Sequence, residues 1–282
     1  MKLCDLHTHS IYSDGSWPVE QLLDEAERIG LSAIALTDHN TISGLGPFMA
    51  AAEGRSVEAV PGTEFSLDYR GTEIHMLGLF IRPEHYEIVA KTLEKSQRLK
   101  VESNKDLVRK LNAAGYKLDY DRICSLTADG QFNRAHVAGE LVRLGYMADR
   151  KEAFNKLLAQ ECGYYVPPKR MTAAEGVRFI KSLGAVAVLA HPLLTLKPEA
   201  LHPLLEELVP LGLDAMETNY VNYDAETTQL ACEIADAFGL KHSGGSDFHG
   251  DAKPDIRLGV GRGELAVPAE LVDGLRSCAK LG

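Results

Sequence analysis

The sequence has no apolar run long enough to cross a membrane. No stretch of about 18 uninterrupted apolar residues occurs in the chain, whereas a spanning helix needs about 20 predominantly apolar residues. The N-terminus also lacks the basic segment followed by an apolar segment that marks a secretory signal peptide. We therefore expect a cytoplasmic protein with no membrane partner.

Cysteine is scarce and scattered. The 282-residue chain has five cysteines, an odd number, and none of them forms a Cys-x-x-Cys pair; they are Cys4, Cys124, Cys162, Cys232 and Cys278. This pattern argues against a disulfide framework and against a zinc ribbon, and it fits a reducing compartment.

Positive charge is also in short supply. The chain has 30 Lys and Arg against 40 Asp and Glu, a net charge of −10. Proteins that hold a long nucleic acid use many contacts between Lys or Arg and phosphate, so this balance disfavours an extended nucleic-acid groove and leaves a local one open. An acidic soluble surface explains the charge by itself, and carboxylate ligands of bound cations are the alternative explanation.

The chain does have a regular alternation of strand-like and helix-like segments. The predicted strands are residues 3–9, 32–37, 57–60, 74–80, 185–190, 214–218 and 240–243. The predicted helices of this pattern are residues 18–29, 41–53, 173–183, 198–208, 225–238 and 268–280. About seven strands in alternation with helices indicate an α/β protein with a parallel sheet or a barrel.

The alternation fails for about a hundred residues between Phe80 and Ala185. Residues 84–114 read as a long charged helix, intact or broken, and residues 136–144 and 151–160 read as further helical segments. A structureless loop of this length is improbable in a compact domain. The segment is therefore expected to fold as helices.

These segments set the predicted domain boundaries. We expect residues 1–99 and 169–282 to form one α/β domain, and residues 100–168 to form an inserted small helical subdomain. Residues 105–125 also have the outline of a helix-turn-helix, but no basic recognition helix is evident, which favours a packing role.

Histidines and carboxylates follow the ends of the predicted strands, beginning with His7 and His9. Successive side chains alternate across a strand, so these two imidazoles point to the same side, and imidazole is the commonest metal ligand in proteins. The complete candidate set is His7, His9, Asp14, His39, Glu64, His75, His191, Asp247 and His249. Ligands from so many strands converge at the mouth of a closed barrel more readily than along an open sheet, so we predict a barrel.

Several candidates have an ordinary structural explanation when taken singly. His75 in a hydrophobic strand is commonly a core histidine, Asp14 before glycine is commonly a turn residue, and His39 is compatible with a helix cap. A purely structural explanation fits Asp247 and His249 less well, because the surrounding glycines let the backbone approach a ligand closely. Together the imidazoles and carboxylates, with no thiolate, suit two or three Mn, Fe or Zn ions.

The same motifs resemble those of the PHP (polymerase and histidinol phosphatase) family, a branch of the amidohydrolase superfamily. They are DLHTHS with SDG, TDHN, PGTE, HMLG, AHP and GSDFHG, and they extend from His7 to His249. The resemblance implies a distorted (β/α)7 TIM-like barrel with two or three divalent metal ions, Mn first and Fe or Zn as alternatives. Residues 1–99 and 169–282 would then form a metal-dependent hydrolase barrel, and the subdomain 100–168 would cap its active site. The ligand groups that the resemblance implies are His7, His9, Glu64 and Asp247; Asp14, His39 and His249; and Glu64, His75 and His191.

The helical insertion and the Asn133-Arg134-Ala135-His136 element resemble one subgroup of the family. This subgroup contains the nucleoside 3′,5′-bisphosphate phosphatases and the related 5′→3′ exoribonucleases of short RNA. We therefore expect a metal-dependent phosphatase that converts nucleoside 3′,5′-bisphosphates to nucleoside 5′-monophosphates and phosphate, with no obligate protein partner. The alternatives are an exoribonuclease on short 5′-phosphorylated RNA, another small-molecule phosphatase, and a non-catalytic metal-binding domain.

Roles follow from this chemistry. Bound metals lower the pKa of water and polarise a phosphoryl oxygen, and the expected reaction is in-line attack on phosphorus. The predicted catalytic residues are Glu64, His249 and Asp247, with Asp247 as a proton shuttle. The predicted substrate-binding residues are Arg134, His136, Lys169, Arg170, Asn219, Asn222 and Ser246. Arginine offers a bidentate fork for phosphate. The alternative interpretation of Lys169-Arg170 is a solvated surface pair, and that of Asn219 and Asn222 is a pair of turn residues.

Overall fold

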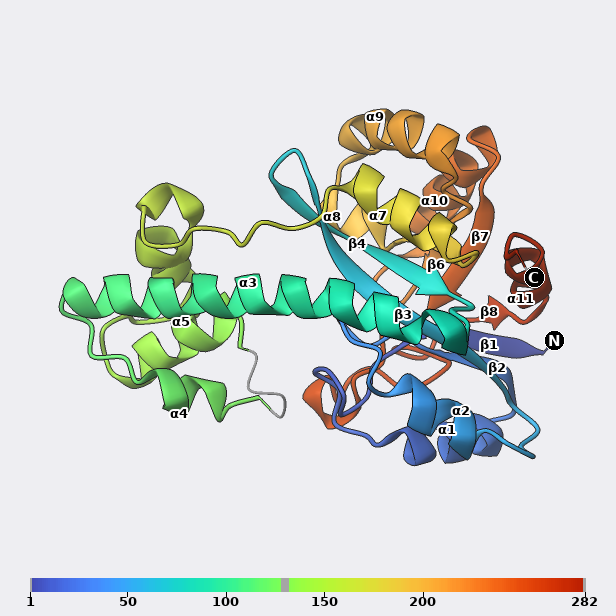
Figure 1. Cartoon of the computed structure of the whole chain (residues 1–282), viewed down its shortest axis with the longest axis horizontal. Helices are drawn as coiled ribbons and strands as arrows, with labels where there is room; N and C mark the ends of the chain where they lie inside the picture. The colour runs from blue at the N-terminus through green and yellow to red at the C-terminus, as the bar shows by residue number, and fades with distance from the viewer. Residues whose placement is uncertain (1, 128–131, 281–282) are drawn as a thin grey trace. The chain divides into compact units, whose positions relative to one another are not determined.

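A computed structural model describes residues 2–127 and 132–280 of the chain (Figure 1). The chain divides into two compact units. The first consists of Met1–Lys91 and Arg170–Gly282, and the second consists of Thr92–Lys169. None of the helices in the described part of the chain is long and apolar enough to cross a membrane.

The first unit is built on one eight-stranded sheet. Its strands are β1 (Leu3–Thr8), β2 (Leu31–Leu36), β3 (Glu58–Tyr69), β4 (Thr72–Leu79), β5 (Val186–Ala190), β6 (Ala215–Tyr220), β7 (Lys241–Gly245) and β8 (Val267–Pro268). Their spatial order is β7-β6-β5-β4-β3-β2-β1-β8. A Cβ atom added to Gly245 of β7 would lie 2.5 Å from the backbone nitrogen of His7 in β1. The sheet therefore nearly closes on itself, and the predicted barrel is confirmed.

Strand β4 departs from the expected parallel arrangement. It pairs antiparallel with both β3 and β5, so the prediction of uniform strand-helix alternation is wrong here. The reason is a two-residue turn, Arg70-Gly71, in which both residues have positive φ (52° and 85°), the geometry of a tight hairpin. The reversal pairs His75, near the start of β4, with Ala190 at the end of β5. It thereby brings His75 to the carboxyl ends of the neighbouring strands.

Helices cover the outside of the sheet, as Figure 1 shows. They are α1 (Val19–Arg28), α2 (Leu45–Ala51), α7 (Ala173–Ser182), α8 (Pro192–Thr195), α9 (Pro198–Leu208), α10 (Ala225–Ala237) and α11 (Glu270–Arg276). Inside the barrel, fully buried aliphatic side chains such as Leu6, Val60, Leu77 and Val188 form one core cluster. Burying each of them stabilises the fold by about 1.5–3 kcal/mol. The barrel interior is therefore a packed core beneath the strand ends.

The second unit consists mainly of helices. Helix α3 (Tyr86–Ala113) begins in the first unit and enters the second without a break, over 28 residues. It is followed by α4 (Tyr120–Cys124), α5 (Arg134–Arg143) and α6 (Arg150–Ala153). Leu107, Leu111, Phe132 and Leu141 belong to a separate buried cluster. The unit thus has its own hydrophobic core, and its position over the active site stays a prediction.

The contact between β7 and β1 generates a testable prediction. We expect Gly245→Ala to destabilise the protein by about 1–3 kcal/mol, because the new methyl group overpacks against the backbone of His7. Urea denaturation measures the change. Gly46→Ala is the matched control, since Gly46 lies exposed in α2 with nothing within 4 Å of an added Cβ. Equal stabilities of the two variants would contradict the close approach of β7 to β1.

Candidate metal centre

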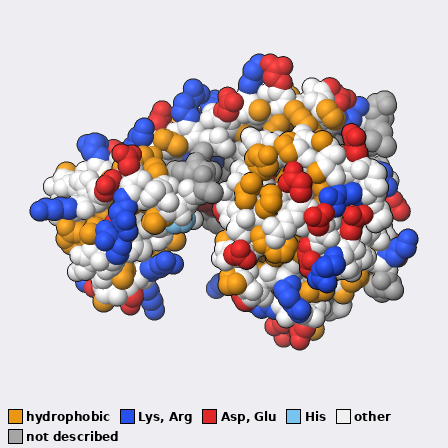
Figure 2. All heavy atoms as spheres, turned by 90° about the horizontal axis from the view of Figure 1, so that it is seen from below, with side chains coloured by type: hydrophobic (Ala, Val, Ile, Leu, Met, Phe, Trp, Pro, Cys, Tyr) orange, Lys and Arg blue, Asp and Glu red, His pale blue; other side chains and the backbone are white. Residues whose placement is uncertain are grey.

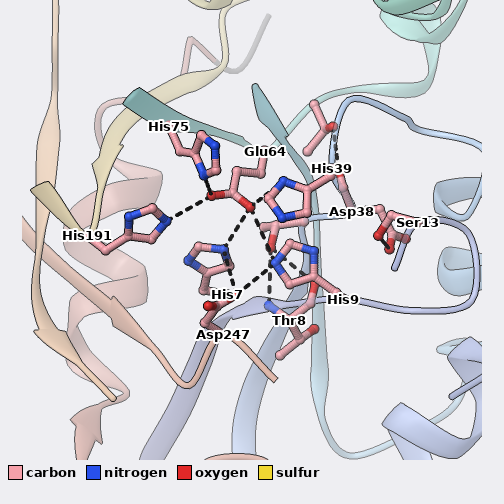
Figure 3. Close-up of polar contacts among 12 residues, drawn as sticks. His7, Thr8, His9, Ser13, Asp38, His39, Glu64, His75, His191 and Asp247 are labelled. Carbon is pink, nitrogen blue, oxygen red and sulfur yellow. Dashed lines mark hydrogen bonds and ion pairs between the residues drawn. The ribbon is translucent and has the colours of Figure 1, made fainter. Parts of the chain in front are cut away.

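The strand ends bring the predicted ligands to one mouth of the barrel (Figure 3). His7 lies in β1 and His9 follows it, both fully buried, with ring centroids 5.1 Å apart. The other predicted ligands come from β3, from β4 and from segments that follow β1, β2, β5 and β7; they are Asp14, His39, Glu64, His75, His191, Asp247 and His249. The structure therefore brings together residues that lie up to about 240 positions apart.

Glu64 lies in the middle of this group, as Figure 3 shows. Its side chain is fully buried. Five imidazole nitrogens approach its carboxylate: at Oε2 those of His7 (3.2 Å), His9 (3.4 Å) and His39 (3.0 Å), and at Oε1 those of His75 (2.8 Å) and His191 (3.1 Å). The two oxygens of Glu64 thus face separate sets of imidazoles, and Glu64 would hold cations together with either set.

The ligand atoms fall into three overlapping groups, each within 4.8 Å: His9, Asp14, His39 and His249; His7, His9 and Glu64; and His39, Glu64 and His75. Asp247 Oδ1 lies 3.1 Å from His9 Nε2. Asp14 is the most exposed of these side chains, at 54%, yet its Oδ1 lies 3.2 Å from His249 Nε2. The assignment of individual ligands to individual ions stays a prediction.

The residues fit a set of divalent cations. Several buried polar atoms have no hydrogen-bond partner within the described part of the chain: His7 Nε2, both ring nitrogens of His9, Glu64 Oε2, His75 Nδ1 and His191 Nδ1. Buried polar atoms without partners are costly. Metal ions would accept their lone pairs, and a nitrogen-oxygen donor set is suited to Mn, Fe or Zn.

The electrostatics divide the histidines of the cluster. Burial opposes the protonation of His7 and His75, but Glu217 and Glu64 raise the pKa of His7 well above its ordinary value, and Glu64 raises that of His75 to about 10. These two imidazoles would therefore release a proton when a metal binds.

Burial, reinforced by His249 and His39, lowers the pKa of His9 to about 3. Burial opposes the ionisation of Glu64, but the surrounding histidines outweigh it and hold the pKa of this carboxyl well below its ordinary value. Neutral imidazole and ionised carboxylate are the forms that bind metals.

Glu217, in β6, was missed in the sequence. Its side chain is fully buried, its Oε1 accepts a hydrogen bond from His7 Nδ1 (3.0 Å), and its Oε2 accepts one from the backbone N–H of His191 (2.7 Å). A carboxylate on the outer nitrogen of a ligating histidine fixes the tautomer and the ring orientation. The available signal was a glutamate in the interior of the predicted strand 214–218, beside Ala215 and Met216.

Ser246 was predicted to bind phosphate, and its contact with substrate stays a prediction. It is fully buried, and its hydroxyl donates to Asp5 Oδ2 (2.5 Å) while its backbone N–H donates to Asp5 Oδ1 (2.9 Å). Asp5 also accepts from the backbone N–H of Gly259 (2.8 Å). Ser246 thus fixes the loop that carries Asp247, and its hydroxyl is committed to that contact.

The other predicted substrate residues of the first unit have protein partners. Arg170 pairs with Glu73 (2.8 Å), and Asn219 Nδ2 donates to Thr218 Oγ1 (3.1 Å). Asn222 is exposed, and its side-chain oxygen accepts from Arg262. Their contact with substrate stays a prediction.

Three predicted substrate residues belong to the second unit. Arg134 donates to the carbonyl of Leu158 (3.0 Å) and lies over the ring of Tyr165. His136 Nδ1 lies 3.2 Å from the backbone nitrogen of Asn133, as part of the capping box of α5. Lys169 is the last residue of the unit. Their role towards substrate also stays a prediction.

The barrel and its histidine-carboxylate cluster define a metal-dependent hydrolase. Residues 5–165 match the model of the PHP domain, and the chain belongs to the PHP family. A crystal structure from Bifidobacterium adolescentis, assigned as a metal-dependent phosphoesterase, superimposes with a TM-score of 0.78 at 25% identity and covers 99% of this chain and 96% of that one.

Relatives with assigned activities differ in their substrates. A 5′-3′ exoribonuclease of Haemophilus influenzae is 31% identical over 88% of this chain and 90% of its own. A phosphoribosyl 1,2-cyclic phosphate 1,2-diphosphodiesterase of Eggerthella lenta is 31% identical over 87% of this chain and 94% of its own. A 3′,5′-nucleoside bisphosphate phosphatase of Chromobacterium violaceum is 28% identical over 87% of this chain and 86% of its own. The protein is thus a metal-dependent phosphoesterase, a hydrolase of phosphate esters.

Glu217 provides a test of how the imidazoles are oriented. We expect Glu217→Gln to weaken metal binding by about tenfold to a hundredfold, because His7 Nδ1 loses its charged acceptor. Metal titration followed by elemental analysis measures the loss. Glu226→Gln, at an exposed position in the first turn of α10, is the control. Wild-type metal affinity in Glu217→Gln would contradict the assigned role.

Metal removal should also lower stability. A ligand that binds only the folded state at a hundredfold excess over its Kd adds about 2.7 kcal/mol. We therefore expect a chelator to lower the thermal midpoint and Mn to restore it, as calorimetry with metal analysis would show. A midpoint that stays constant while the metal content falls to zero would count against metal binding in the cluster.

Proposed function

We propose that the protein removes the 3′-phosphate from nucleoside 3′,5′-bisphosphates and releases nucleoside 5′-monophosphate and phosphate. The observation that carries this proposal is the convergence of imidazoles and carboxylates on the buried Glu64. Such a centre would hold two or three divalent cations, with Mn as the first choice. Their positive charge compensates a multiply charged phosphate ester, whereas a neutral amide substrate has no charge to compensate. The bisphosphate phosphatase of Chromobacterium violaceum supports the choice of ester.

The residues of the chain contribute binding and orientation. Divalent metals held there would lower the pKa of a water molecule and polarise the phosphoryl oxygen. Glu64 and the histidines would hold them, and Glu217 accepts a hydrogen bond from His7 that fixes the orientation of its ring. Asp247 presents Oδ1 to His9 while its Oδ2 accepts two hydrogen bonds. Those donors favour the ionised carboxylate, which supports a ligand role for Asp247 over the proton-shuttle role.

A 5′→3′ exoribonuclease acting on short RNA is the second candidate, and the charge distribution favours it. Residues 92–169 contain 14 Lys and Arg against 10 Asp and Glu, although the whole chain has 30 against 40. Lys and Arg side chains are spread over the face of this unit seen in Figure 2. The net charge of the whole chain therefore understates how well one unit suits an anionic polymer.

Hydrolysis assays distinguish the two candidates. With Mn present, we expect phosphate release from adenosine 3′,5′-bisphosphate with 5′-AMP as the other product. Glu64→Gln, which should lose activity, controls for contaminating phosphatases and nucleases. No phosphate release from the bisphosphate, combined with mononucleotide release from 5′-phosphorylated RNA and a steep loss of RNA affinity with salt, would replace the first candidate by the second.

A further inference from the structure

The carboxylate of Asp247 has two differently occupied oxygens. Oδ1 lies 3.1 Å from His9 Nε2. Oδ2 accepts a hydrogen bond from the hydroxyl of Tyr220 (2.9 Å) and another from Nζ of Lys253 (2.9 Å). Tyr220 is the last residue of β6 and is only 2% exposed. Because this rigid donor already fixes Oδ2, the orientation of Asp247 does not require Lys253.

Lys253 is held by its backbone beside the metal cluster. It follows a short 3₁₀ turn, Gly250–Ala252. Its N–H donates to the carbonyl of Gly250 (3.1 Å), and its carbonyl accepts from Ile256, which is buried. The turn itself is tied down where the N–H of Asp251 donates to Ser16 Oγ (2.6 Å). The backbone of Lys253 is therefore fixed before any ligand arrives.

The ammonium group of Lys253 has donors to spare. Its side chain is 38% exposed, and an ammonium group has three N–H donors. Among the described residues, the structure gives Nζ one hydrogen-bond acceptor, Asp247. By contrast, Arg170 is paired with Glu73, and Arg134 donates to a carbonyl in the second unit. Lys253 thus combines a fixed position, a direct link to a residue of the cluster and an exposed positive charge.

We propose that Lys253 binds a non-bridging oxygen of the substrate phosphate at the edge of the metal centre. Lysine binds phosphate as a compact point charge, and its charge adds to that of the cations where the ester is most negative. The proposal rests on the phosphoesterase function of the site and holds for either proposed substrate. It adds a specificity for anionic esters that the imidazoles and carboxylates do not provide.

The test compares Lys253→Met and Lys253→Arg with Lys241→Met, an exposed lysine at the opposite end of β7. Titration calorimetry measures the affinity of each Mn-loaded variant for inorganic phosphate, and kinetics measure KM for the ester. We expect Lys253→Met to weaken phosphate binding and raise KM by about tenfold to a hundredfold, since a charged hydrogen bond is lost. Metal content and thermal midpoint should stay at wild-type values. Lys253→Arg should retain most of the affinity, and Lys241→Met should match the wild type.

Two outcomes would overturn the proposal. Unchanged phosphate affinity in Lys253→Met would show that the ammonium group does not contact phosphate. Loss of metal from Lys253→Met would show that Lys253 acts through Asp247 as a positioning residue. Calorimetry separates this proposal from the proposed function. The wild-type protein could hydrolyse neither substrate, while Lys253→Met binds phosphate more weakly than the wild type does. That combination would contradict the proposed substrates and support the role of Lys253.

Discussion

The contact between Glu64 and its surrounding imidazoles is the interaction on which the rest of the site depends. A buried carboxylate is strongly unfavourable unless opposite charge or hydrogen bonds compensate it, and five imidazoles from different segments supply that environment. The barrel is the scaffold that makes this possible, because its strand ends surround one point. The strands β1 to β5 and β7 each carry or precede at least one of the residues in this cluster.

Local rules predicted a large part of this arrangement. The alternation of side chains in β1 correctly placed His7 and His9 on one side, and the recurrence of ligand-type residues after strand ends favoured the barrel. The direction of β4 was not predictable in the same way, because it is decided by the backbone of a two-residue turn at Arg70. The role of Glu217 was not predictable from the sequence because its partner His7 lies 210 positions away, and a glutamate inside a strand does not show which histidine it contacts.

The residues that contact the candidate ligands could also not be recognised from the sequence. The contacts of Tyr220 and Lys253 with Asp247 can be recognised only in the folded structure. The hydrogen bond from Ser246 to Asp5 is likewise visible only there, because the two residues lie 241 positions apart. The net charge of the whole chain conceals a difference between the two units. The value of −10 combines an acidic barrel with a basic helical unit, so it describes the charge of neither.

The contact of β7 with β1 has a consequence for the order in which the protein becomes active. His7 and His9 are made first, whereas Asp247 and His249 follow the last long strand of the barrel. During synthesis His7 and His9 are made more than 200 residues before Asp247 and His249. Contacts of such sequence separation form late in folding. The complete set of candidate ligands therefore exists only once β7 has joined β1, so that closing the barrel and completing the cluster are the same event.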